Sequence, residues 1–485
     1  MWESGSPVCS RMAFSAWVAW LGAALILGAG GCGPKFPNKE AQCPAESIAG
    51  EGYEFESMAL GPGNTDRLFV CLTFSGGGTR AAALAYGVLE GLRGTAIPPL
   101  PGDGRPRCLL DEVDIVSSVS GGSFTALALG RWGDELFSSP FADRFLYHNV
   151  TADLVTRIIV QNLLILPIIF PDRIHIAADY MNERVFDHMT YAGLRQQRPF
   201  IVVNATSMAG HRFQFTQDDF DLLGSDLDSV PLGHAAMASS AFPLLLSPMR
   251  LRYYRNDLST YALRQVLTDD DSELSTPRRR QWARQVVVPD APDYGLDADE
   301  HRFVYLLDGG VCDNLGLEYV IDAYRYGPIQ RRLAASADPN QRIEHLVVIV
   351  VNATPELPEE IEDRKIAPGL FDMASRSAAI GVNSHTRTSL EFARCLLEPD
   401  QIHRPGEGAQ ASLSTESAEM TRAWQGHLIE INLQHLQDPD RRQRLARLPT
   451  DFHLHKDEVR DLIAAGRELL TTHSGFVKLQ AALAR

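Results

Sequence analysis

The chain has 485 residues, of which 45% are hydrophobic and 22% charged, so it is neither disordered nor collagen-like. Its formal net charge of −16 argues against nucleic acid as a partner and against electrostatic attraction to anionic lipid. Contact with a membrane would therefore need apolar burial or a covalent anchor. The seven cysteines form no C-x-x-C pair, and no other metal-binding spacing occurs, so we expect neither a metal nor a cofactor.

The N-terminus resembles an export signal. Arg11 precedes an uncharged apolar run over residues 12–31, and Cys32 follows directly after the small residues 29–31. This junction is similar to a bacterial lipoprotein cleavage box, which implies a signal peptide over 1–31 and lipidation of Cys32. Cleaved soluble secretion and a retained anchor stay open, since about 20 residues can just span a bilayer. Each alternative places the protein outside the cytoplasm, either anchored by lipid in the cell envelope, at the outer membrane, or secreted.

Residues 32–64 are rich in glycine, proline and polar residues, and we expect a flexible tether there. Continuous apolar runs beyond them predict buried strands at 68–74, 113–116, 200–204, 303–307 and 346–351. Helical spacing of apolar residues follows several of these runs. Buried strands that alternate with helices are typical of a three-layer α/β/α fold with a largely parallel central sheet.

Three further segments stand apart from this pattern. Residues 252–301 are polar and predict a surface insertion. Residues 158–170 are almost wholly apolar but too short to span a bilayer, so they are either a buried core helix or a flap over an acyl pocket. Helical spacing over 459–470 predicts that the C-terminal extension, 401–485, is helical and packs on the main domain.

The first of three glycine-rich turns contains Gly76, Gly77 and Gly78, directly after an expected strand. Its spacing fits neither a P-loop nor a dinucleotide-binding turn. Backbone N–H groups that point inward from such a turn could form an oxyanion hole for an acyl group. A turn that only needs glycine geometry is the alternative.

The second turn, residues 118–122, is nearly the G-x-S-x-G elbow that holds a catalytic serine between a strand and a helix. Ser118 occupies the first glycine position, and Gly122 occupies the second. This spacing predicts Ser120 as a nucleophile, and the alternative is a serine that only caps the helix.

The third turn begins with Asp308, which follows an expected strand and precedes Gly309 and Gly310. An aspartate in this place could be a base, a metal ligand or a turn residue. Because the carboxyl ends of parallel strands meet at one edge of a sheet, we expect all three turns to converge on one crevice.

Taken in this order, the three turns resemble the patatin-like phospholipase family, and the stretches 202–215 and 236–249 are similar to further parts of it. The resemblance implies a patatin-like fold and a serine–aspartate dyad without histidine, made of Ser120 and Asp308. None of the 14 histidines lies in a motif that demands a base. The remaining implied site residues are Gly76, Gly77 and Gly78 in the oxyanion hole, Arg80 to hold that loop or contact a phosphate, and Gly122, Gly309 and Gly310 in support.

The resemblance also implies a function. We expect a lipid acyl hydrolase of the phospholipase A or lysophospholipase type, acting on a lipid or phospholipid at a membrane surface, with its hydrolase domain over 65–400. A thioesterase or an esterase for other substrates could use the same dyad, and a non-catalytic envelope lipoprotein that binds lipid is an alternative of another class. Neither the acyl position nor the oligomeric state can be predicted from the sequence.

Overall fold

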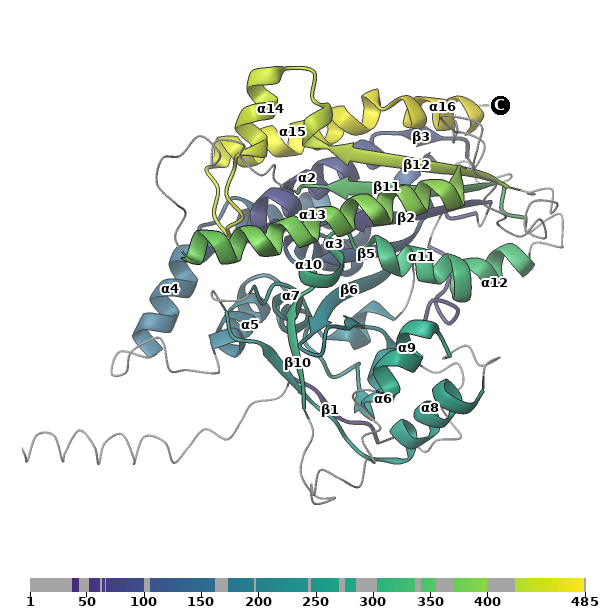
Figure 1. Ribbon diagram of the computed structural model, residues 1–485. Helices are drawn as coiled ribbons and strands as arrows, with labels where there is room; N and C mark the ends of the chain where they lie inside the picture. Colours follow the sequence, from purple (N-terminus) through teal and green to yellow (C-terminus); the bar gives the residue numbers. More distant parts are fainter. Residues whose placement is uncertain are drawn as a thin grey trace, which may run out of the picture. The chain divides into compact units, whose positions relative to one another are not determined.

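Apolar runs rich in valine, isoleucine and leucine form the central sheet in the computed structural model of the protein (Figure 1). Its strands lie in the order β12-β11-β2-β5-β6-β10-β9, and β7 pairs with β6. The four pairs from β12 to β6 are parallel, whereas β10 is antiparallel to both of its neighbours. The prediction of a largely parallel sheet is therefore confirmed. The strands are β2 Leu68–Phe74, β5 Val113–Val119, β6 Phe200–Ser207, β7 Arg212–Gln214, β9 Met249–Arg252, β10 Phe303–Asp308, β11 His345–Asn352 and β12 Gln425–Asn432.

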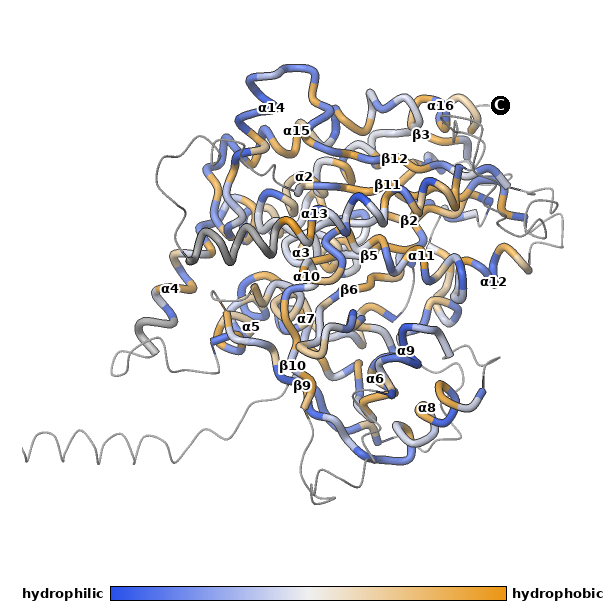
Figure 2. The backbone as a smooth tube through the Cα atoms, in the orientation of Figure 1, coloured by the Kyte–Doolittle hydropathy of each residue, from blue (hydrophilic) through white to orange (hydrophobic). Residues whose placement is uncertain are grey.

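Helices cover both faces of this sheet, so the three-layer architecture is confirmed as well. In Figure 1, α11 and α13 lie in front of the sheet and α2 and α3 lie behind it. Figure 2 shows hydrophobic residues along the strands and hydrophilic residues on the outer helix α14. The longer helices are α2 Gly78–Arg93, α3 Gly121–Trp132, α4 Val150–Gln161, α5 Arg173–Arg184, α7 Leu232–Ser239, α8 Asp257–Thr268, α11 Leu317–Tyr326, α12 Pro328–Ala335, α13 Leu370–Leu397, α14 Pro439–Ala446, α15 Lys456–Thr472 and α16 Ser474–Leu483.

Shorter elements complete the fold: β1 Lys39–Glu40, β3 Ala96–Ile97, β4 Arg107–Cys108, β8 Ser225–Asp226, α6 Gln217–Leu222, α9 Pro277–Trp282 and α10 Gly310–Asp313. The structure describes residues 37–42, 52–61, 63–65, 67–99, 105–161, 173–195, 198–242, 246–269, 275–284, 303–335, 342–354, 370–398 and 424–483, all within the unit Pro37–Arg485. No helix in these ranges has the length and apolar character needed to cross a membrane. The predicted signal peptide, Cys32 and most of the apolar segment 158–170 lie outside the described residues.

The segment predicted as a tether packs on the domain where the structure describes it. Tyr53 is fully buried, and its hydroxyl hydrogen-bonds both the N–H and the carbonyl of Ile201 in β6. Phe55 is buried nearby, and β1 pairs with β8. The prediction of a flexible tether over 32–64 is therefore wrong for this part of the chain, because single aromatic residues among polar ones supply the contacts.

The C-terminal extension is not only helical. Residues Gln425–Asn432 form β12, which pairs in parallel with β11 at the end of the sheet. Behind the sheet, the predicted helix appears as α15 and packs along α2 so closely that a Cβ at Gly87 would lie 2.0 Å from the Ile463 carbonyl oxygen. The extension thus completes both the sheet and one helical layer.

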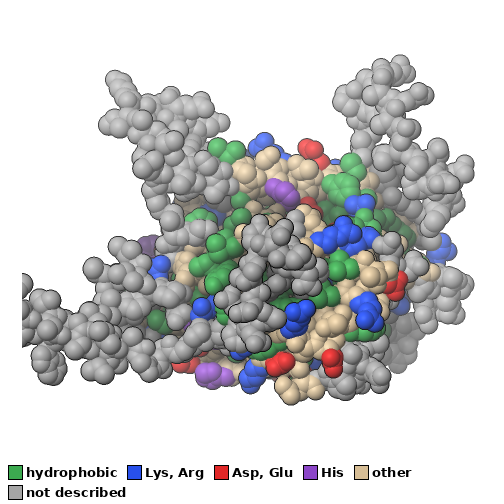
Figure 3. All heavy atoms as spheres, turned by 60° about the horizontal axis from the view of Figure 1, so that its bottom comes forward, with side chains coloured by type: hydrophobic (Ala, Val, Ile, Leu, Met, Phe, Trp, Pro, Cys, Tyr) green, Lys and Arg blue, Asp and Glu red, His purple; other side chains and the backbone are tan. Residues whose placement is uncertain are grey.

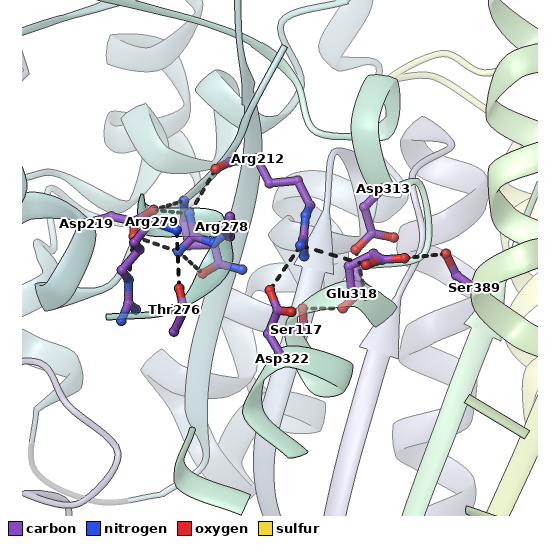
Figure 4. A network of polar contacts seen from close by, with 12 residues as sticks. Ser117, Arg212, Asp219, Thr276, Arg278, Arg279, Asp313, Glu318, Asp322 and Ser389 are labelled. Carbon is purple, nitrogen blue, oxygen red and sulfur yellow. Dashed lines mark hydrogen bonds and ion pairs between the residues drawn. The ribbon is translucent and has the colours of Figure 1, made fainter. Parts of the chain in front are cut away.

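The polar insertion also differs from the prediction, since it is not confined to the surface. Its helix α9 buries Trp282 and carries Arg278 and Arg279, which point toward Asp219 of α6 (Figure 4). Arg278 donates to both oxygens of Asp219, at 2.7 and 2.9 Å. Charged residues predict exposure, but here Arg279 is buried and the Arg278 side chain is only 9% exposed, because a carboxylate 59 and 60 residues earlier in the chain pairs with them.

Candidate active site

Ser120 lies in a sharp turn between β5 and α3. Its backbone has φ 49° and ψ −123°, a region that residues with a side chain rarely adopt. Such a strained strand-to-helix turn is the geometry of a nucleophile elbow. The Ser120 N–H donates to the Ser239 hydroxyl at 2.7 Å, and that hydroxyl donates to the Asn204 carbonyl at 2.6 Å. The turn is thus held from α7 and β6.

The two glycine positions of the elbow have different steric demands. A Cβ at Gly122 would lie 2.7 Å from the Phe74 Cβ and from the Ser75 carbonyl oxygen, so only glycine fits there. Ser118 is instead the sixth residue of β5, and its hydroxyl donates to the Val202 carbonyl at 3.0 Å. The side chain at this position therefore fits between two strands, and the departure from the glycine pattern does not distort the turn.

Ser120 and Asp308 are in direct contact. The Ser120 hydroxyl donates to Asp308 Oδ2 at 2.9 Å, and the Gly310 N–H donates to Asp308 Oδ1 at 2.8 Å. Both residues are buried, with 6% and 7% of their surface exposed. Neither has a histidine partner among the described residues. Gly310, predicted as a supporting residue, thus orients the carboxylate through its backbone.

Asp308 reaches the serine from a direction that the sequence does not indicate. Strand β10 is antiparallel to β6, so its carboxyl end does not point toward the edge where β5 ends. The register of the strands brings Asp308 and Ser120 together instead. Asp308 pairs with Ala205 of β6, and Val119, which precedes Ser120, pairs with the adjacent Asn204. The predicted convergence of the three turns is correct, but the argument from parallel strands holds only for β2 and β5.

Burial dominates the electrostatics of the Asp308 carboxyl. Desolvation raises its pKa to about 6, although the hydrogen bonds from Gly310 and Ser120 act to lower it. No arginine or lysine pairs with Asp308 in the described part of the chain. A carboxylate of this kind is ionised at neutral pH but holds a proton more readily than an exposed one, as a general base should.

The glycine loop after β2 lies beside this pair, since a Cβ at Gly76 would be 3.4 Å from the Ser120 Cβ. The Gly76 N–H, however, donates to the Asn314 carbonyl at 3.0 Å, so this predicted oxyanion donor is already used. The N–H groups of Gly77 and Gly78 have no acceptor among the described residues, and the same holds for Gly121. Gly121 follows the serine directly, where such elbows provide an oxyanion donor; this donor was missed by the sequence analysis.

Arg80 is fully buried and does not face a substrate site. Its three donor groups bind the Ala353 carbonyl, the Leu448 carbonyl and the Thr450 hydroxyl. The prediction that it holds the glycine loop fits these contacts, whereas contact with a substrate phosphate does not. Neither Leu448 nor Thr450 could be anticipated, since they lie about 370 residues away in the chain.

A cavity among the described residues lies away from the dyad. It measures about 460 Å³ and is lined by residues at the amino end of β6 and by the insertion, among them Tyr53, Phe200, Asp221 and Arg278. None of the predicted site residues borders it. No cluster of three or more potential metal ligands occurs in the described ranges.

Residues 72–321 match the sequence profile of the patatin-like phospholipases, and this match covers just over half of the chain. The chain belongs to the patatin-like phospholipase family. Membership implies a lipid acyl hydrolase, a class that generally uses a serine. Ser120, Asp308 and the glycine loop all lie within the matched residues, whereas β11, β12 and α15 lie beyond them.

Two solved structures are similar in arrangement. Human GIVD cytosolic phospholipase A2 shares 13% sequence identity, with 94% of this chain and 69% of that chain covered and a TM-score of 0.41. VipD from Legionella pneumophila shares 10% identity, with 83% and 67% covered and a TM-score of 0.24. No curated protein matches the sequence.

Proposed function

We propose that this patatin-like protein hydrolyses carboxylic esters of lipids through an acyl-enzyme on Ser120, with Asp308 as the base. The observation that carries the proposal is the 2.9 Å hydrogen bond between the two side chains at a strained elbow. Asp308 accepts the hydroxyl proton while Ser120 Oγ attacks the ester carbonyl. The tetrahedral oxyanion then accepts hydrogen bonds from Gly77, Gly78 and Gly121.

Collapse of this intermediate breaks the ester bond, and the protonated Asp308 returns its proton to the departing alcohol. Water then attacks the acyl-enzyme, with Asp308 again as the base, which releases the fatty acid and restores the Ser120 hydroxyl. No second titratable residue is needed, since one carboxyl accepts and donates the proton in turn.

Apolar side chains near the dyad support a lipid substrate. Phe242 is 45% exposed and follows Ala241, whose carbonyl accepts the Asp308 N–H. Val311 is 47% exposed three residues after Asp308, and Met208 is 62% exposed where its N–H binds Tyr305 of β10. Figure 3 shows exposed hydrophobic side chains on the face turned forward, with lysine, arginine and polar side chains between them. Exposed apolar surface beside a catalytic pair suits acyl chains better than a polar substrate.

The test uses a phospholipid in mixed micelles, a soluble p-nitrophenyl ester and a fluorophosphonate probe that labels reactive serines. We expect fatty acid release, ester turnover and labelling on Ser120 by the wild type, and none of these by Ser120→Ala. Ser123→Ala is the matched control, since Ser123 lies three residues after Ser120, in the first turn of α3, but contacts Ser239 rather than Asp308. Labelling at another serine, or turnover that survives in Ser120→Ala, would contradict the proposal. No turnover by the wild type would favour a non-catalytic, lipid-binding role.

We further propose that Cys32 anchors the protein to the cell envelope, which the small residues before it support. Mass spectrometry of the N-terminal peptide from bacterial membranes should find a lipidated Cys32. The Cys32→Ala variant should lose the lipid mass and leave the membrane fraction. An unmodified Cys32 in the exported wild type would contradict this proposal.

A further inference from the structure

The segment of residues 448–452, between α14 and α15, binds the start of α2. In Figure 1 it is part of the yellow loop that runs down toward α4. The Asp451 carbonyl accepts the Thr79 N–H at 2.8 Å, and a Cβ at Gly78 would lie 2.4 Å from the same carbonyl oxygen. The glycine loop, which supplies the proposed oxyanion donors, is therefore in direct contact with a part of the chain outside the family match.

Within the described ranges, the Arg80 guanidinium donates hydrogen bonds to neutral acceptors only. Two come from this segment, the Leu448 carbonyl and the Thr450 hydroxyl at 3.2 Å, and the third is the Ala353 carbonyl at 3.0 Å. No carboxylate pairs with the guanidinium in the described part of the chain. Its Nη2 lies 3.3 Å from the place a Cβ would take on Gly77. A buried, uncompensated positive charge thus lies directly behind the oxyanion loop.

Residues 448–452 also contact two further helices, α3 and α4. The Phe452 ring packs edge-on against Phe124 of α3, with centroids 5.6 Å apart. The Thr151 hydroxyl of α4 donates to Asp451 Oδ1 at 2.5 Å. Helix α3 begins one residue after Ser120, so the segment joins the helix of the nucleophile, the helix of the glycine loop and α4.

Burying a cation without a counter-charge is costly, so this arrangement needs a reason. Carbonyl and hydroxyl oxygens hold the guanidinium in place but leave its net charge intact. In a buried site that charge acts over several ångströms with little screening. Positive potential that is fixed in advance stabilises negative charge as it develops on a substrate.

We propose that residues 448–452 are a positioning element of the active site, which holds the glycine loop and keeps Arg80 charged beside the oxyanion. This inference rests on the proposed function. It makes two demands that a purely structural role does not. A negative charge added beside Arg80 should slow the chemical step without loosening the fold, and a neutral substitution at the same position should not.

Thr450→Asp tests the first demand, because Thr450 is exposed and its side chain already reaches Arg80. We expect kcat for a soluble ester, per active site titrated with fluorophosphonate, to fall about tenfold or more. KM should stay within about twofold and the melting temperature should hold or rise, since the new carboxylate pairs with a buried cation. Thr450→Asn is the matched neutral control and should keep kcat within about threefold of the wild type.

Two further variants complete the test. Arg80→Gln removes the charge, and we expect it to lower kcat about 100-fold or more in the titrated, folded fraction. Arg467→Gln breaks the 3.4 Å contact of α15 with Glu90 at the other end of α2 and should leave kcat unchanged. Wild-type kcat in Thr450→Asp, or equal losses in Thr450→Asp and Thr450→Asn, would overturn the inference while the proposed function stands. A wild type without turnover or labelling overturns both.

Discussion

Two buried aspartates, Asp308 and Asp219, have opposite surroundings. Among the described residues, Asp308 receives hydrogen bonds only from a hydroxyl and a backbone N–H, and burial raises its pKa to about 6. Asp219 is fully buried as well, which would raise its pKa, but the charges of Arg278 and Arg279 outweigh burial and hold the pKa below its ordinary value. Asp308 can therefore exchange a proton near neutral pH, whereas Asp219 stays ionised there.

The difference shows how one residue type serves catalysis in one place and stability in the other. A charge buried without a counter-ion destabilises the fold and is available for chemistry. A charge buried with two arginines cannot be removed without taking an ion-pair partner from each of them, and Arg279 then keeps only Asp218 among the described residues. Substitution by asparagine should therefore have opposite effects at the two positions, on activity as well as on stability.

The largest effect is expected for Asp308→Asn. Loss of the base should reduce ester turnover about 10⁴-fold, as measured by initial rates with the soluble ester. Because the folded pKa lies above the unfolded one, ionisation of Asp308 costs stability as pH rises through about 6. The variant should therefore be more stable than the wild type at pH 8, by about 1–3 kcal/mol in urea unfolding. A variant that is inactive and also less stable at pH 8 would contradict this assignment.

Asp219→Asn should show the reverse. It leaves Arg278 and Arg279 without their shared carboxylate, so we expect the free energy of unfolding to fall by about 3–5 kcal/mol at pH 7. The kcat of the folded protein should be unchanged. The folded pKa is depressed, so the contribution of Asp219 is present above its unfolded pKa and is lost as pH falls. The difference from the wild type should accordingly shrink in acid. Asp461→Asn, at a more exposed pair with Arg441, is the control and should cost about 1 kcal/mol or less.

The pH profile of kcat/KM provides a third test. Activity should fall about tenfold per pH unit below about pH 6, as the free enzyme's Asp308 becomes protonated. Asp219 should not contribute to this loss of activity at low pH, because its depressed pKa keeps it ionised near pH 6. The measurement needs a neutral ester, so that the substrate itself does not titrate. An activity that is constant down to pH 4.5 would rule out Asp308 as the base with this pKa.

The smallest effect is expected for Ser118→Gly, which restores the usual elbow pattern. The substitution removes the hydrogen bond to the Val202 carbonyl and should cost about 1 kcal/mol of stability. Activity should stay within about twofold of the wild type, since the Ser118 hydroxyl donates to β6 and not to Asp308. Thermal unfolding and initial rates measure the two quantities. A large loss of activity would mean that Ser118 positions the nucleophile.

Local patterns in the sequence predict much of the fold and part of the site. Strands β2 and β11 lie within about one residue of the predicted runs, because both are continuously apolar and buried on two faces. Ser120 could be placed at a strand-to-helix turn because the elbow is a contiguous motif. Its role, and that of Asp308, stay predictions until the variants are measured.

The features missed by the sequence analysis depend on partners far away in the chain. Antiparallel pairing of β10 cannot be seen in its apolar run, which is the same for either direction. Polar composition predicts an exposed insertion, but Arg279 is buried where it pairs with Asp219. Ser239 is an exception, since it lies in the stretch 236–249 that resembles the family, and that resemblance is a sequence signal for a residue near the elbow.

Strand β12 has a consequence for how the protein can be produced. It covers one side of β11, and β11 in turn covers β2, in which all seven residues are buried. A fragment cut at the bounds of the family match, 72–321, would lack β11 and β12. What remains of β2 would then be a free apolar edge without proline or charge, a template for intermolecular strand pairing and aggregation. Soluble protein therefore requires the chain through β12, well past the residues that define the family.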